Sequence, residues 1–109
     1  MATSTIKNIN NTNYIYPTPA NGLGGSVQLI KIGRIIIVGY SDLVVNATIQ
    51  MDTVICTGLT NALDNSSTIY LASPTGFYRC MVNTSGNLIA KADIPSGYYI
   101  MGGSYVSNS

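Results

Sequence analysis

Two basic side chains, Arg79 and Lys91, stand at matching positions at the ends of the stretch RCMVNTSGNLIAK. The pattern predicts two strands joined by a polar turn over residues 83–87, which sets Arg79 directly opposite Lys91. A pair of cations can bind an anion such as a sugar phosphate or a uronate, and an arginine matches phosphate in a bidentate way. The hairpin is therefore a candidate anion site.

Two other interpretations of this pair stay open. Basic residues on a solvated or edge strand deter unwanted strand pairing, and Asp93 is near enough in the sequence to relieve the repulsion. Alternatively, the cations meet Asp64 or Asp42 across a subunit interface. A slip of one residue in the pairing would place a different side chain opposite Arg79.

The chain lacks the residue types on which most catalytic and metal sites depend. It has no His and no Glu, so Ser-His-Asp and Cys-His arrangements are excluded. The four aspartates are scattered, which predicts neither a metal cluster nor a carboxylate pair for glycoside cleavage. No glycine-rich loop leads into a helix to hold phosphate. We expect no enzymatic activity, no catalytic residue, no metal and no cofactor.

The composition is unusual for a soluble monomer. Charged residues make up 8% and hydrophobic residues 46% of the 109 residues, and the net charge is +1. A balance so close to neutral gives no basic footprint for nucleic acid. The longest apolar run is broken by Lys31 and Arg34, so membrane insertion is not expected, and the N-terminus shows no apolar signal segment. The apolar excess indicates burial between subunits.

The elements that position these residues are strands throughout. Short alternating runs separated by Gly, Pro, Asn and Ser predict an all-β antiparallel barrel or jelly-roll-like sandwich of about seven to eight strands. Residues 26–41 read as a hairpin that turns at Gly33 and Arg34, and residues 47–57 read as one alternating strand. The two cysteines, Cys56 and Cys80, lie in apolar runs and are interpreted as buried thiols rather than a disulfide.

Residues 1–25 contain Asn, Thr, Pro and Gly without a period, and they predict an extended N-terminal arm before a head domain at 26–109. The YIY within this arm is expected to pack against a neighbouring chain. Within the head, alternation turns Cys80 and Val82 toward the core and Arg79 away from it.

Three segments carry a resemblance to a known family: NGLGGSVQLIKIGRIIIVGYSD, FYRCMVNTSGNLIA and IPSGYYIMGGSYV. In this order and spacing they resemble the C-terminal head domain of siphophage receptor-binding proteins, which form the tail tips of phages that infect Gram-positive bacteria. The similarity covers roughly residues 21–106. It implies a β-barrel head, a homotrimer, and non-covalent binding of a host cell-surface saccharide.

The resemblance also implies a place for the protein in the virion, at the tail tip or baseplate. The host cell-wall polysaccharide would be one partner and other tail proteins, held through the N-terminal arm, another. Trp and His, which relatives use at their saccharide sites, are absent here. The arm is too short for the shoulder and neck regions of the relatives, so we expect an excised head or a separate small tip protein. A purely structural trimeric virion protein, such as a capsid decoration or baseplate component, is the alternative.

The predicted contact set combines the basic pair with tyrosines that can stack on a sugar ring and with a polar loop. Tyr98 and Tyr99 are adjacent in the sequence, so one of them must face outward. The candidate saccharide-binding residues are Arg79, Lys91, Tyr78, Tyr98, Tyr99, Asp64 and Asn65, with Asn61 as a further loop donor.

Overall fold

The computed structural model describes residues 12–109, and these form a single antiparallel sheet of nine strands. No helix in this part of the chain is long and apolar enough to cross a membrane. The all-β antiparallel architecture expected from the sequence is confirmed. The strands are β1 (Thr12–Ile15), β2 (Thr18–Pro19), β3 (Leu23–Ile32), β4 (Ile35–Val45), β5 (Val54–Thr57), β6 (Thr68–Ser73), β7 (Gly76–Val82), β8 (Leu88–Ala90) and β9 (Gly97–Val106).

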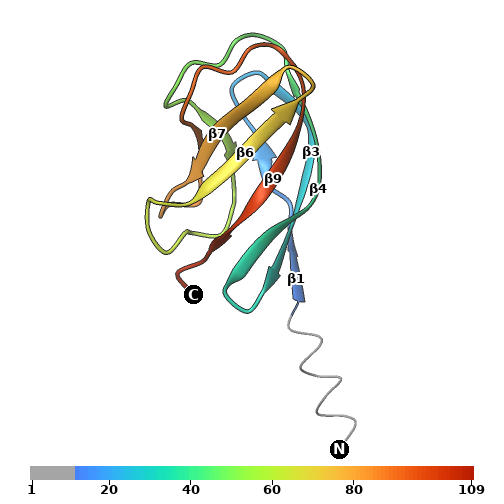
Figure 1. Cartoon of the computed structure of the whole chain (residues 1–109). Coiled ribbons are helices and arrows are strands. Elements are labelled where there is room, and N and C mark those ends of the chain that lie inside the picture. The colour runs from blue at the N-terminus through green and yellow to red at the C-terminus, as the bar shows by residue number, and fades with distance from the viewer. Residues whose placement is uncertain (1–11) are drawn as a thin grey trace, which may run out of the picture.

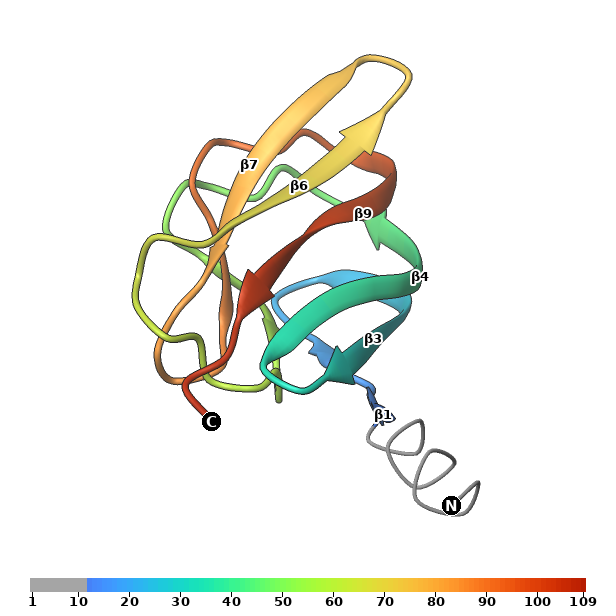
Figure 2. The ribbon, with the colours of Figure 1, turned by 60° about the horizontal axis from the view of Figure 1, so that its bottom comes forward.

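The sheet curls into a half-barrel (Figures 1 and 2). Its strand order is β1-β3-β4-β9-β6-β7-β8-β5-β2, so the C-terminal strand β9 lies in the middle, between β4 and β6. Figure 1 shows the β6–β7 turn at one end of the molecule, and the β3–β4 turn and the C-terminus at the other. The strands therefore connect two distinct ends of the molecule.

The core lies inside the curl and follows the alternation of the strands. Every second residue of β6 and β9 points inward, because successive side chains in a strand face opposite sides of the sheet. Burial of these aliphatic side chains is the main source of the fold's stability. The largest fully buried side chains are Leu29, Ile36, Leu43, Ile55, Ile69, Leu71, Leu88, Ile94, Val27, Val45, Val82 and Cys56.

Strand pairing begins at Thr12, well inside the segment assigned from the sequence to an arm. β1 pairs with β3 and β2 pairs with β5, so residues 12–19 join the two sides of the curl. Residues 12–25 thus contribute β1, β2 and the start of β3 to the sheet, and the rest of the predicted arm lies outside the described residues. Tyr14 of the YIY motif contacts β3 of its own chain, in register with Ile30.

The β7–β8 hairpin has the predicted register. Val82 is opposite Leu88 and Cys80 is opposite Ala90, and the backbone N–H of Lys91 donates to the carbonyl of Arg79 at 2.9 Å. Cys80 and Val82 are buried, as the alternation requires. The two thiols are free and buried, which confirms their interpretation as core residues.

The segment 47–57 differs from its predicted single strand. The chain turns at Met51 and Asp52, where Asp52 has a φ of 71°, and only residues from Val54 onward pair as β5. A positive φ is uncommon for a residue other than Gly, and Asp is among those that tolerate it. The alternation of apolar residues continued through this turn and concealed it.

Candidate functional site

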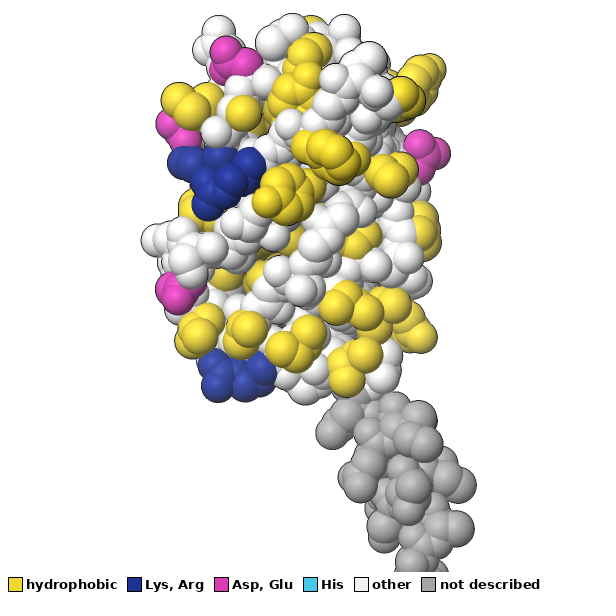
Figure 3. Space-filling view, in the orientation of Figure 1, with side chains coloured by type: hydrophobic (Ala, Val, Ile, Leu, Met, Phe, Trp, Pro, Cys, Tyr) yellow, Lys and Arg dark blue, Asp and Glu magenta, His cyan; other side chains and the backbone are white. Residues whose placement is uncertain are grey.

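Four large apolar side chains lie together on the outer face of the sheet, over β7, β6 and β9. Phe77 is opposite Ala72, which is in turn opposite Ile100, so three adjacent strands share one transverse row. Phe77 and Tyr98 are 76% and 75% exposed, values far above those of core aromatics. We call Tyr70, Phe77, Tyr98 and Ile100 the outer apolar band. Figure 3 shows hydrophobic side chains gathered over these strands.

Two rings of this band pack against each other. Tyr70 and Phe77 meet edge to face, with ring centroids 6.4 Å apart and planes at 81°. Such aromatic pairs favour a fixed geometry. Tyr98 and Ile100 are two residues apart in β9 and therefore point to the same side. The band thus combines one packed pair of rings with two exposed side chains of β9.

A groove borders the band at the end of the molecule where β6 turns into β7. It encloses about 310 Å³. Its walls are mainly apolar, and its polar groups come from one carboxylate, one serine hydroxyl and tyrosine. The residues that line it are Asp42, Ala72, Ser73, Pro74, Tyr98, Tyr99 and Ile100. A second hollow, lined in part by Ser96 and Gly97, shares Ser73, Pro74, Tyr98 and Tyr99 with it.

Two tyrosines support the groove from within. Tyr99 is 3% exposed, and its hydroxyl donates to the carbonyl of Pro95 at 2.7 Å. Tyr78 packs edge to face against Tyr99 at a centroid distance of 5.8 Å. Burial raises the pKa of Tyr99, and the neighbouring Tyr78 adds to this effect. Tyr99 therefore stays neutral and acts as a structural floor, whereas Tyr98 is the exposed member of the adjacent pair.

Asp42 lies within an interruption of the β4–β9 ladder. The regular pairing stops after Ile37 and resumes at Leu43. Within this gap the backbone N–H of Met101 donates to the Ser41 hydroxyl at 2.6 Å, so a side chain replaces a strand partner. Irregular pairing of this kind re-aims side chains and is frequent beside binding sites.

The predicted basic pair is placed side by side, but its two members have different surroundings. Arg79 is exposed and in register with Tyr70, so it borders the outer apolar band. The polar contact of its guanidinium within residues 12–109 is a long one, 3.4 Å from Nε to the Thr68 hydroxyl. Arg79 thus remains available to a ligand.

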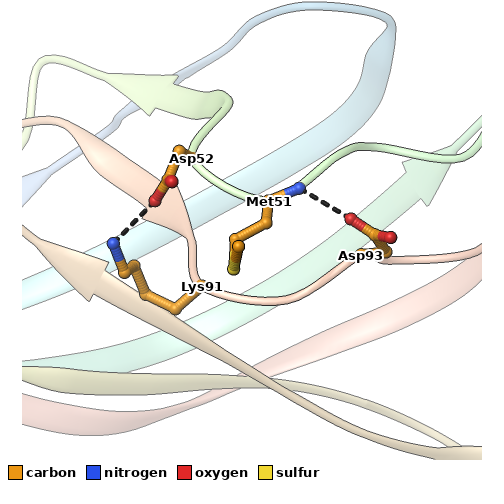
Figure 4. A network of polar contacts seen from close by, with 4 residues as sticks. All are labelled: Met51, Asp52, Lys91 and Asp93. Atoms are coloured by element: carbon orange, nitrogen blue, oxygen red, sulfur yellow. Dashed lines mark hydrogen bonds and ion pairs between the residues drawn. The ribbon is translucent and has the colours of Figure 1, made fainter.

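Lys91 is already paired, and its partner is not the one named from the sequence. Its Nζ lies 2.7 Å from Oδ1 of Asp52, in the turn before β5. Asp93, the expected partner, instead accepts a hydrogen bond from the backbone N–H of Met51 at 2.9 Å (Figure 4). The repulsion between the two cations is thus relieved by a residue remote in sequence.

The loop residues of the predicted set lie away from the groove. Asp64 and Asn65 precede β6, whereas the groove lies at the other end of that strand. Asp64 accepts hydrogen bonds from the hydroxyl and then the backbone N–H of Ser66, and these lower the pKa of its carboxyl. Asn65 accepts from the backbone N–H of Thr84 at 3.1 Å. Asp64 thus stabilises its own loop, whereas Asn65 ties this loop to the β7–β8 turn.

The end of the molecule remote from the groove carries a second apolar surface. Ile32 is opposite Ile35, Ile35 is opposite Val106, and the backbone of Leu63 donates to that of Val106. All four side chains are exposed, and we call them the lower aliphatic row. Figure 3 shows hydrophobic side chains across this end as well. The row lies beside the start of β1, because Thr12 is in register with Ile32.

The structure brings together three of the predicted site residues and separates the others. Tyr98 and Tyr99 line the groove and Tyr78 packs against Tyr99, Arg79 borders the outer apolar band, and the remaining three lie elsewhere. The sequence reasoning missed Asp42, Tyr70, Phe77 and Ile100 as members of one surface. Phe77 carried a signal, because alternation placed this large aromatic residue on the same outward face as Arg79.

This arrangement supplies the chemistry of a binding site. Exposed rings can stack on a flat partner, the Asp42 carboxylate and the Tyr98 hydroxyl can form hydrogen bonds, and Arg79 can pair with an anion. Among residues 12–109, no three His, Cys, Asp or Glu side chains lie close enough to hold a metal ion. Comparison of the chain with protein-family models and with curated proteins finds no match.

Proposed function

We propose that this protein is a phage tail-tip head domain that binds a host cell-surface saccharide non-covalently, as a homotrimer. The observation that carries the proposal is the outer apolar band with the groove beside it. Aromatic side chains that are 75% exposed or more keep a large apolar surface in water, and a partner that covers this surface gains the free energy of its burial. A saccharide ring is such a partner, because it has an apolar face and carries hydroxyls around its edge.

The polar groups around the band suit such a ligand. The carboxylate of Asp42 accepts hydrogen bonds from hydroxyls at one side of the band, and the guanidinium of Arg79 donates to anionic substituents at the other. Because Lys91 is paired with Asp52, Arg79 alone is expected to bind the anion that the sequence assigned to both cations. Individual contacts of this kind are weak, and repetition around a tail tip would raise avidity through effective concentration.

The lower aliphatic row supports the homotrimer. Aliphatic side chains that line up across β3, β4 and β9 form an exposed apolar surface of the kind that subunits bury. This surface lies at the end remote from the groove and beside the start of β1. A trimer formed there would present its grooves away from the tail, with the start of β1 on the side of the other tail proteins.

The lower aliphatic row also fits the second candidate, a purely structural trimeric virion protein. In that case the outer apolar band would be an additional contact surface rather than a ligand site. The two functions differ in one measurable respect. A saccharide-binding head attaches to host cells and is released by soluble wall polysaccharide, and a structural protein does neither.

The test combines light scattering with sedimentation of the protein on Gram-positive cells. Tyr98→Ala and Phe77→Ala should keep the oligomeric state and weaken cell binding roughly two- to tenfold per site, the range expected for one aromatic contact. Met51→Ala is the control, because Met51 is also exposed but lies in the turn before β5, outside both the outer apolar band and the lower aliphatic row. Equal binding by all three variants would exclude the outer apolar band as the saccharide site. A trimer that binds no cell or wall polysaccharide would favour the structural role.

A further inference from the structure

The groove carries a net charge, which hydrogen bonds to saccharide hydroxyls do not require. Asp42 is the charged residue among the seven that line it, and it is exposed at the surface. Within residues 12–109 the salt bridge joins Lys91 to Asp52, so Asp42 has no cationic partner there. The groove therefore combines apolar walls with one uncompensated negative charge.

The fold holds Asp42 in this position from both neighbouring strands. On one side, the Ser41 hydroxyl anchors β4 to the backbone of Met101. On the other side, the backbone of β3 approaches Asp42 so closely that a Cβ on Gly25 would lie 1.7 Å from the Asp42 carbonyl oxygen. Gly25 has a φ of 100°, which L side chains rarely adopt. The carboxylate is thus carried on a fixed backbone.

The side chains that line the groove favour one kind of cation over another. A calcium or magnesium ion needs several oxygen ligands, and the groove supplies one carboxylate. The hydroxyl of Ser73 is already paired with that of Thr75 at 2.9 Å. By contrast, the Tyr98 ring, Pro74 and Ile100 offer apolar contacts and the face of an aromatic ring. An alkylated ammonium group gains from such contacts, because its methyl groups are apolar and its charge is attracted to the ring.

We propose that the groove binds a quaternary ammonium group of the choline type, with the charge beside Asp42 and the methyl groups against Tyr98. The source of this group rests on the proposed function: the ammonium would be a substituent of the cell-surface saccharide. The ligand would then carry a cation at the groove and contact the rings of the outer apolar band with its sugars.

The test adds choline or its neutral isostere 3,3-dimethyl-1-butanol to the full chain. Binding is measured by NMR from the shifts of the backbone amide signals of Ala72 and Ile100. Choline should shift these signals at millimolar concentration, and the neutral isostere should bind about three- to fivefold more weakly, as expected for the loss of one exposed charge pair. Asp42→Asn should remove this difference. Asp64→Asn is the matched control, because it removes the same charge at the other end of β6.

Two results would overturn the inference. One is equal binding of choline and the isostere to the unmodified protein, and the other is an Asp42→Asn variant that still prefers choline. Failure of the proposed function looks different, because choline would bind while no cell or wall polysaccharide does. Cosedimentation with phosphatidylcholine vesicles would assign the ammonium to a lipid head group and overturn its saccharide source.

Discussion

The Ser41 hydroxyl is the most informative single group to remove, because it links the stability of the sheet to the shape of the groove. It accepts a hydrogen bond from the backbone N–H of Met101 at 2.6 Å, at the point where the β4–β9 ladder is interrupted. In Ser41→Ala that backbone donor has no partner. Met101 is 6% exposed, so water cannot easily replace the hydroxyl.

The expected cost follows from the chemistry of a buried donor. Leaving such a donor unsatisfied costs about 1–3 kcal/mol, so Ser41→Ala should lower the free energy of unfolding by about 2 kcal/mol. For a domain of this size that corresponds to a fall in Tm of roughly 8–16 °C. Urea titration followed by circular dichroism measures the change. Ser41→Thr keeps the hydroxyl and should recover most of the loss.

Ser104→Ala provides the comparison on β9. Ser104 is exposed and its side chain makes no hydrogen bond within residues 12–109, so the change should stay within about 0.5 kcal/mol. A Ser41→Ala protein as stable as Ser104→Ala would refute the reasoning. It would mean that β4 and β9 close into a regular ladder without the serine, and that the irregularity does not depend on it.

Three further outcomes are expected. Gly25→Ala should cost about 3 kcal/mol of unfolding free energy, measured by urea titration, because its Cβ would collide with a backbone oxygen of β4. Lys91→Met and Asp52→Asn should each change stability by less than about 1 kcal/mol, because their ion pair is largely solvated; a larger loss would show that the pair organises the turn. Burial raises the pKa of Cys56 and Cys80 from 9.0 to about 12. Unfolding then releases protons above about pH 9, so the free energy of unfolding should fall as pH rises from there. A Cys56→Ala, Cys80→Ala double variant whose stability showed the same pH slope would contradict this.

The β7–β8 hairpin could be predicted from the sequence because its determinants are local. Asn83 holds the turn by accepting from the backbone N–H groups of Ser85 and Asn87, each at 3.0 Å. Alternation of apolar residues on either side then sets the register. Every element of this prediction lies within a short stretch of the chain.

The surroundings of the hairpin could not be predicted in the same way. Lys91 and its partner Asp52 are 39 residues apart, and their contact depends on the pairing of β5 with β8. The outer apolar band draws on β6, β7 and β9, and the groove adds Asp42 from β4. Alternation assigns each of these residues to a face, but only the order of strands in the sheet makes them neighbours.

The pairing of residues 12–19 has a consequence for proteolysis and aggregation. This one segment covers the outer edge of β3 through β1 and that of β5 through β2. Its strands are short and contain or adjoin Pro17 and Pro19, features that discourage further strand addition. A single cut between Pro19 and Leu23 followed by loss of the segment would uncover both edges at once. The ten-residue strand β3 would then be free to pair with another chain, so a trimmed protein should form fibrillar or swapped assemblies that the intact one avoids.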